Sequence, residues 1–180
     1  MLEIDLIEKC KNNDRKSQMQ LYDKYCDGMF CVAMRYVKNT DDAQDVMQEA
    51  FIKAFQKLNQ FKAEVTFGAW LKRIVINKCL DFLKSKHQEV VAINENMSLL
   101  KDDDTWEINE TIDVAVIKNV IETLSDKYKY VLMLYLIEGY DHDEISQILG
   151  INNATSRTNL LRGKQKLKGL LKELNYGEGY

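Results

Sequence analysis

Apolar residues in the first half of the chain recur every three or four positions, the period of an amphipathic helix packed on a core. The pattern predicts three helices, over residues 17–37, 41–58 and 66–84. Asp41 is expected to cap the second helix and Thr66 the third, because short polar side chains accept the unpaired amide hydrogens of a first turn. The first half is therefore predicted to be a set of helices with short connections.

Helical periodicity stops between residues 88 and 111, where the chain becomes polar and then strongly acidic, so this stretch is predicted to be a tether. The pattern resumes at residue 112 with one helix and then a second, which has Ser125 as its expected cap and apolar positions up to Ile137. The sequence thus predicts an all-α fold of two small helical domains, residues 1–87 and 112–180, joined by an acidic linker.

The last part of the chain has the layout of a helix-turn-helix. A short helix is expected to begin at a capping box formed by Asp141 and Glu144 and to end at Gly150, since glycine readily adopts the left-handed conformation that ends a helix. A second, basic helix should start two or three residues later. Because the second helix of this motif enters the DNA major groove, the layout predicts duplex DNA as a ligand.

The two faces of that second helix differ. Four leucines are predicted to form its buried stripe, namely Leu160, Leu167, Leu171 and Leu174. The other side carries residues suited to DNA contact: Arg157, Thr158, Leu161, Arg162 and Gln165. Arginine binds guanine edges or phosphates, and threonine and glutamine can contact either. The alternative is a solvated basic face, but the glycine turn and the capping box together favour DNA binding.

Composition supports the helical prediction and shows where the charge lies. The chain has no proline and 8 glycines, so little interrupts long helices. The formal net charge is −3, yet residues 71–86 hold five basic side chains against one acidic, and residues 153–174 hold six against one. Because polyanions respond to local charge, both stretches are candidate nucleic-acid surfaces.

An aromatic loop next to the first basic stretch suits single-stranded DNA. Bases can stack on Phe61 and Trp70 while lysines follow the phosphates, and Asn77 can hydrogen-bond an extruded base. The alternative is that both aromatic residues belong to the core and that Lys78 and Lys84 are merely solvated. The residues by themselves leave both interpretations open.

A third candidate surface is the polar side of the helix over residues 41–58. It carries Asp45, Gln48 and Glu49, while its apolar positions face inward. Such a face is normally plain soluble surface, but it could also dock on a basic helical partner.

Several classes of function find no support. The four cysteines, Cys10, Cys26, Cys31 and Cys79, show no Cys-x-x-Cys spacing, so we expect no metal site and mostly buried, reduced thiols. No Gly-rich phosphate loop or nucleophile–base arrangement points to an enzyme or a cofactor. The sequence shows no signal peptide or membrane-length apolar run, so we expect a cytoplasmic protein without direct membrane insertion.

The order of these features resembles the sigma factors of the sigma-70 family. Residues 42–51, DAQDVMQEAF, are similar to the family's polymerase-binding signature, and residues 67–77, FGAWLKRIVIN, to the promoter-melting segment that follows it. Residues 124–128 and 138–151 resemble the family's fourth region. The resemblance spans residues 18–171 and is closest to the small extracytoplasmic-function class.

The resemblance implies roles for the candidate residues. Asp45, Gln48 and Glu49 would bind core RNA polymerase at the clamp helices of its β′ subunit, and the β flap of the polymerase is a further expected partner. Residues implied in capture and melting of the −10 element are Phe61, Lys62, Trp70, Asn77, Lys78 and Lys84. Residues implied in binding the −35 element are Thr155, Ser156, Arg157, Thr158, Leu161, Arg162, Gln165 and Lys166.

Three residues of the second basic helix depart from the family pattern. Ser156 stands where an aliphatic residue is usual, Asn159 replaces a common basic residue, and Gly163 replaces a usual alanine. A glycine inside a helix costs about 1 kcal/mol relative to alanine.

The resemblance predicts a promoter-specificity subunit that directs initiation at −10/−35 promoters and performs no bond chemistry. It also implies an anti-sigma factor as a further partner. The alternative is a two-domain helix-turn-helix regulator that does not bind core polymerase. The polar signature at Asp45–Glu49 and the acidic tether favour the sigma factor.

Overall fold

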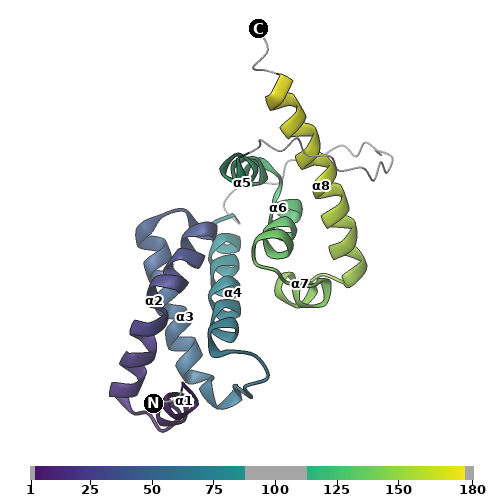
Figure 1. Cartoon of the computed structure of the whole chain (residues 1–180). Coiled ribbons are helices and arrows are strands. Elements are labelled where there is room, and N and C mark those ends of the chain that lie inside the picture. Colours follow the sequence, from purple (N-terminus) through teal and green to yellow (C-terminus); the bar gives the residue numbers. More distant parts are fainter. Residues whose placement is uncertain (1–2, 88–112, 177–180) are drawn as a thin grey trace. The chain divides into compact units, whose positions relative to one another are not determined.

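The computed structural model describes residues 3–87 and 113–176, and every regular element within these ranges is a helix (Figure 1). The chain divides into two compact units, Met1–Asn96 and Met97–Tyr180. The predicted all-α fold of two helical domains is thereby confirmed. The acidic tether predicted over residues 88–111 lies outside the described residues, so the domain boundaries remain a prediction.

Residues 3–87 of the first unit form four α-helices and one short 3-10 turn. They are α1 (Glu3–Lys11), α2 (Arg15–Val37), α3 (Thr40–Gln56), η1 (Leu58–Gln60) and α4 (Phe67–His87). Three of the α-helices match the predicted ones, whereas the hydrophobic pattern does not predict α1. With nine residues, α1 is too short for a periodic run to stand out, although it buries Leu6, Ile7 and Cys10.

Two side-chain caps fix where α3 and α4 begin. Asn39 accepts a hydrogen bond from the backbone N–H of Asp42 at 3.0 Å, so the prediction that Asp41 caps α3 is wrong. Asp41 lies instead in the first turn, where a carboxylate is stabilised by the positive end of the helix dipole. Thr66 accepts from the backbone N–H of Ala69 at 3.3 Å, which confirms the predicted cap of α4.

Helix α4 packs against both α2 and α3. Its inward side chains have no exposed surface: Leu71, Val75, Ile76 and Cys79. Complete burial of one aliphatic side chain stabilises the fold by about 1.5–3 kcal/mol. This apolar seam therefore fixes the rotation of α4 and determines which of its polar residues face solvent. Burial also raises the pKa of the Cys79 thiol to about 12, so that thiol stays protonated.

All four cysteines are free thiols. Cys10 is buried like Cys79, Cys26 is half-buried, and Cys31 is exposed. The expectation of mostly buried thiols therefore holds for two of them and is wrong for Cys31.

Residues 113–176 of the second unit form four α-helices and one π-helical turn. They are α5 (Val114–Thr123), α6 (Asp126–Leu132), η2 (Met133–Ile137), α7 (His142–Leu149) and α8 (Asn153–Tyr176). Ser125 precedes α6 as predicted, but its hydroxyl makes no capping hydrogen bond. The helix predicted up to Ile137 changes to π geometry at Met133, a change that apolar periodicity cannot reveal.

The predicted helix-turn-helix is present. Asp141 and Glu144 form both hydrogen bonds of the capping box at the start of α7. Gly150 ends α7 with a φ of +69° and donates its N–H to the carbonyl oxygen of Ser146. Helix α8 then begins at Asn153, three residues further on.

Three of the four predicted leucines form the buried stripe of α8. Leu160, Leu167 and Leu171 are at most 7% exposed, whereas Leu174 is 51% exposed. The prediction for Leu174 is wrong because the last turns of α8 run past α5 and α6 (Figure 1). Amphipathic spacing continues there, beyond the helices that cover the stripe in the described part of the chain.

Gly163 lies where α8 packs tightly on α6. A Cβ atom added at this position would lie 3.1 Å from Cδ1 and 3.2 Å from Cγ of Leu132, a residue with no exposed surface. The glycine that departs from the family pattern therefore permits a close approach of the two helices. Gly169, on the same helix, has nothing within 4 Å of an added Cβ.

These two glycines give a matched pair of substitutions. Gly169→Ala should stabilise the second unit by up to about 1 kcal/mol, since alanine is the better helix former. Gly163→Ala should lose that gain or destabilise the unit, because an added methyl group in a tight core costs about 1–3 kcal/mol. Urea unfolding of the two full-length variants, followed by circular dichroism, measures the difference. Equal stabilisation by both substitutions would contradict the close packing at Gly163.

Candidate nucleic-acid interface

The first turns of α8 present a polar, basic face. Of the residues predicted to contact duplex DNA, Arg157, Thr158, Leu161, Arg162 and Lys166 are exposed. Thr155 and Gln165 are half-buried. Leu161 is 42% exposed although it is apolar, which suits contact with a thymine methyl group. The exposed residues recur three or four positions apart and therefore share one side of the helix.

Ser156 does not belong to that face. It has no exposed surface, and its Oγ lies 2.9 Å from Nδ1 of His142, the first residue of α7. The prediction that Ser156 contacts DNA is wrong, because its hydroxyl joins the two helices of the motif. A small polar residue here permits a bond that the family's usual aliphatic residue would not make.

His142 was not among the predicted site residues, yet it connects three elements. Its ring stacks on Tyr135 of η2 with centroids 5.1 Å apart, while its Nδ1 pairs with Ser156 of α8. Lys164 of α8 also lies over the Tyr135 ring, with its Nζ 5.6 Å from the ring centre. Sequence offered little sign of this role, since a histidine in a first turn is ordinarily solvated.

A short polar chain orients Arg157. Asn153 donates from Nδ2 to Oδ1 of Asp143 at 2.6 Å and accepts at its Oδ1 from Nε of Arg157 at 2.7 Å. The guanidinium is thus held at the start of α8 by a link to α7. Its remaining N–H groups are the forked donors that bind guanine or phosphate.

In the first unit, Phe61 is part of the core. It is 8% exposed and packs against Phe67 and Trp70, with ring centroids 5.8 Å and 5.3 Å away. The structure therefore favours the core alternative for Phe61 and contradicts a role as an open stacking surface. Trp70 is half-buried and Lys62 is exposed, so both are accessible to a ligand.

Three candidates on α4 share a stripe. Trp70, Asn77 and Lys84 are spaced by seven residues, nearly two full helical turns, so they align along one side. Lys78 lies next to this stripe and donates from Nζ to Oε2 of Glu49 on α3 at 2.9 Å. The sequence does not reveal this pair, which joins a candidate DNA residue to a candidate polymerase residue.

The polar face of α3 borders an apolar groove. Asp45, Gln48 and Glu49 are all exposed. Gln48 also lines a groove of about 540 Å³ between α2 and α3. The groove is walled by Met19, Tyr22, Phe51, Ile52 and Phe55, with Arg15 and Gln18 at its edge. Met19 and Ile52 are 61% and 58% exposed, so the groove is an open apolar surface.

The described residues hold neither a metal-binding cluster nor a membrane-spanning helix. Within residues 3–87 and 113–176, no group of three His, Cys, Asp or Glu side chains is placed to hold a metal ion. Over the same residues, no helix combines the length and the apolar character needed to cross a bilayer.

Two family models match the chain, one in each unit. The model for sigma-70 region 2 matches residues 21–89, and the model for sigma-70 region 4 matches residues 115–167. Together they account for about two thirds of the chain, in the order that the motifs predicted. The chain belongs to the sigma-70 family.

Curated relatives agree with this assignment. The chain is 29% identical to the ECF RNA polymerase sigma factor SigW of Bacillus subtilis, over 93% of this chain and 96% of that protein. It is 28% identical to the ECF RNA polymerase sigma-E factor of Haemophilus influenzae, over 94% and 95% of the two chains. The chain therefore falls in the extracytoplasmic-function class of the sigma-70 family.

Two solved structures share the fold. CnrH, in complex with the cytosolic domain of CnrY, has a TM-score of 0.58 and 21% identity over 93% of this chain and 96% of that one. The sigma factor RpoE of Bartonella quintana, in complex with the anti-sigma factor NepR, has the same TM-score and identity over 86% and 96%.

The environment of His142 predicts a pH dependence of stability. Burial and the charge of Arg157 hold the pKa of His142 below its ordinary 6.5, against the opposing effect of Asp141 and Asp143. The unfolded chain therefore binds a proton first as the pH falls. Stability is full above about pH 6.5 and decreases below it.

Urea unfolding between about pH 7.5 and 5.5 tests this dependence. The substitution His142→Gln should make the unfolding midpoint less sensitive to pH in that window, since the titrating group is gone. A wild-type slope retained in the variant would remove His142 as its source.

Proposed function

We propose that this protein is the promoter-specificity subunit of RNA polymerase, acting through three surfaces. The observation that carries the proposal is that each unit matches a different region of one family and exposes its own basic surface. The protein makes and breaks no bonds. It uses binding energy to place the polymerase on duplex DNA and to hold a melted strand.

The exposed face of α8 is proposed to bind the −35 element. Arg157 is held by Asn153 for a directed contact, and Thr158, Leu161 and Arg162 lie on the same side. Thr155, Gln165 and Lys166 border the face and complete the proposed set. Ser156 is left out because it is buried against His142.

The stripe of α4 is proposed to hold the single strand of the −10 element. Trp70 offers part of an aromatic face, Asn77 offers an amide for a base edge, and Lys84 offers charge for a phosphate. Lys62, on the neighbouring loop, and Lys78 add positive charge. Phe61 packs against the Trp70 ring and supports it, and is not proposed to contact a base itself.

The groove beside Gln48 is proposed to bind the clamp helices of the polymerase β′ subunit. An open apolar groove between two helices fits the apolar side of a helical partner, as in other helix-in-groove complexes. Exposed Asp45 and Glu49 lie on the same helix as Gln48 and suit a partner with basic side chains near its apolar stripe.

An anti-sigma factor is proposed as a further partner. One protein of the same fold has been captured with such a factor. Because the proposed role requires binding to RNA polymerase in the cytoplasm, we also propose that the protein acts there.

The polymerase role has a matched test on two exposed isoleucines. Ile52 is 58% exposed in the groove, and Ile4 is 66% exposed on α1. Ile52→Glu should weaken binding to core polymerase about tenfold or more, because burying an isoleucine contributes about 1.5–3 kcal/mol. Ile4→Glu should leave the affinity unchanged. Titration of labelled protein with core polymerase measures both.

The wild-type measurement decides between the two functions. If the wild-type chain forms no stable complex with core polymerase, the sigma-factor role is wrong and the helix-turn-helix regulator takes its place. Equal loss in both isoleucine variants would show that the groove is not the docking surface.

The duplex-binding face has a test in salt dependence. Arg162→Ala should weaken binding to upstream promoter duplex and reduce the slope of log affinity against log salt by about one. Lys172→Ala, ten residues further along α8, is the matched control and should keep the wild-type slope. Electrophoretic or fluorescence titration at several salt concentrations gives the slopes. A wild-type slope in Arg162→Ala would remove Arg162 from the phosphate contacts.

A further inference from the structure

The loop between η1 and α4 is exposed, yet both of its ends are buried. Residues 62–66 are all exposed, and Ala63 has a φ of +58°, an uncommon conformation for a residue with a side chain. Phe61 before the loop and Phe67 after it are 8% and 2% exposed and meet edge to face at 5.8 Å. The loop is thus closed at its base by an aromatic contact.

Tyr25 of α2 extends that contact. Its ring lies 5.3 Å from the ring of Phe67, and its Cε1 would come within 2.9 Å of a Cβ added at Gly68. The absence of a side chain at Gly68 therefore makes room for the Tyr25 ring. Any movement of that ring changes the support of the first turn of α4, where Thr66 caps the helix.

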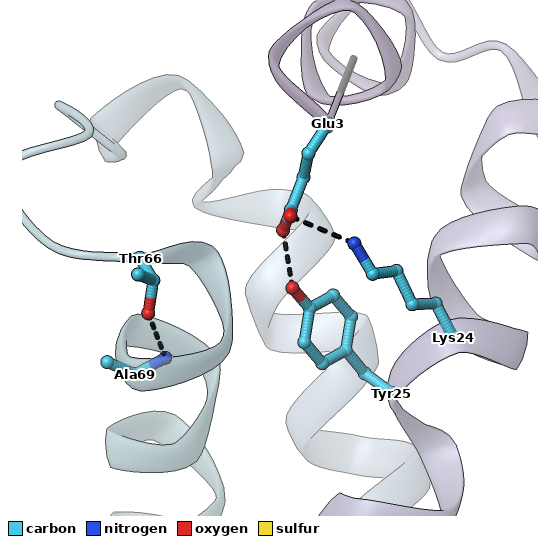
Figure 2. A network of polar contacts seen from close by, with 5 residues as sticks. All are labelled: Glu3, Lys24, Tyr25, Thr66 and Ala69. Carbon is cyan, nitrogen blue, oxygen red and sulfur yellow. Dashed lines mark hydrogen bonds and ion pairs between the residues drawn. The ribbon is translucent and has the colours of Figure 1, made fainter. Parts of the chain in front are cut away.

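The position of Tyr25 is fixed by α1. The Tyr25 hydroxyl donates a hydrogen bond to Glu3, and Lys24 donates to the other carboxylate oxygen of Glu3 at 2.9 Å (Figure 2). The bond from Tyr25, followed by that from Lys24, lowers the pKa of Glu3, so the carboxylate is charged at neutral pH. Hydrogen bonds to a charged acceptor are the stronger kind.

Helix α1 reaches the other end of the loop as well, because it contacts η1 directly. It therefore touches the element before the loop and, through Glu3 and Tyr25, supports the element after it. Yet α1 lies before residue 21, where the match to the region 2 model begins. The region 2 model alone therefore does not describe the half of the brace that α1 provides.

We propose that α1 orders the loop of residues 62–66 for promoter melting, with Tyr25 as the positioning residue. The proposal rests on the proposed function, in which this loop and the α4 stripe hold the −10 strand. Tyr25 itself touches no DNA in this account. It acts by keeping Phe67 and the first turn of α4 in place, so that Lys62 and Trp70 are presented in a fixed arrangement.

The first measurement is amide hydrogen exchange in the full-length protein, without DNA. Tyr25→Phe removes the hydroxyl and keeps the ring, so residues 62–66 should exchange about 3- to 10-fold faster, the value of one hydrogen bond. Glu3→Ala removes the acceptor and should act on the same residues. The double variant should add little to either, since both remove one bond. Lys24→Ala is the matched control for the hydroxyl, because it removes the ion pair to Glu3 and the contact of Lys24 Nζ with the Tyr25 ring, 5.3 Å from its centroid, and leaves the Tyr25 hydrogen bond.

The second measurement is permanganate reactivity of promoter thymines in the holoenzyme, at a promoter found by transcript mapping. Tyr25→Phe should reduce opening and weaken the preference among −10 base variants, while polymerase binding and the opening by Lys24→Ala stay normal. A weaker preference among −10 base variants would indicate that Tyr25 positions the loop. A general loss of stability would instead lower opening equally at all promoters.

The outcomes are distinct. Unchanged exchange of residues 62–66 in both Tyr25→Phe and Glu3→Ala overturns the brace. Faster exchange with normal opening and preference, at a promoter where Lys62→Ala and Asn77→Ala are defective, overturns the positioning role. Faster exchange with normal opening in Lys62→Ala and Asn77→Ala as well refutes the proposed −10 function, while the ordering of the loop by α1 stands.

Discussion

Burial of α4 between α2 and α3 is the constraint on which the first unit's surfaces depend. Leu71, Val75 and Cys79 are four apart and fully buried, so the rotation of α4 about its axis has one solution. With that rotation fixed, Trp70, Asn77 and Lys84 fall on one stripe and Lys78 turns toward α3. The apolar seam thus decides the chemistry of the polar face, although none of its residues meets a ligand.

Packing likewise fixes the rotation of α8 in the second unit. There a close contact is made at a glycine, Gly163, as well as by buried side chains. The close approach at Gly163 and the buried Leu160 and Leu167 fix its rotation against α6. The Ser156–His142 bond then sets its start against α7. Two of the three departures from the family pattern, Ser156 and Gly163, therefore lie on the packed side of the helix. They alter how the DNA-facing side is held rather than what it presents.

The sequence predicted most parts of the fold that depend on local signals, although Asn39, and not Asp41, caps α3. Thr66, the Asp141–Glu144 box and Gly150 act within one or two turns, and each was placed correctly. Parts that depend on distant contacts were not predicted. The burial of Phe61 depends on Phe67 and Trp70 across a loop, and the π turn at Met133 leaves no periodic trace. The predicted burial of Leu174 is wrong for a related reason, since periodicity cannot show where a partner helix ends.

The ion pair between Lys78 and Glu49 bears on whether the two proposed surfaces of the first unit compete. Each partner would attract a different member of the pair, because polymerase would meet the carboxylate and DNA the ammonium. The pair is partly exposed, with 27% and 63% of the two side chains accessible, and such pairs contribute about 1 kcal/mol or less. Separating them therefore costs little compared with the burial of the groove residues around Gln48. It follows that neither surface is masked by the other. The buried seam of α4 holds the two faces in register, and the weak pair leaves both of them available.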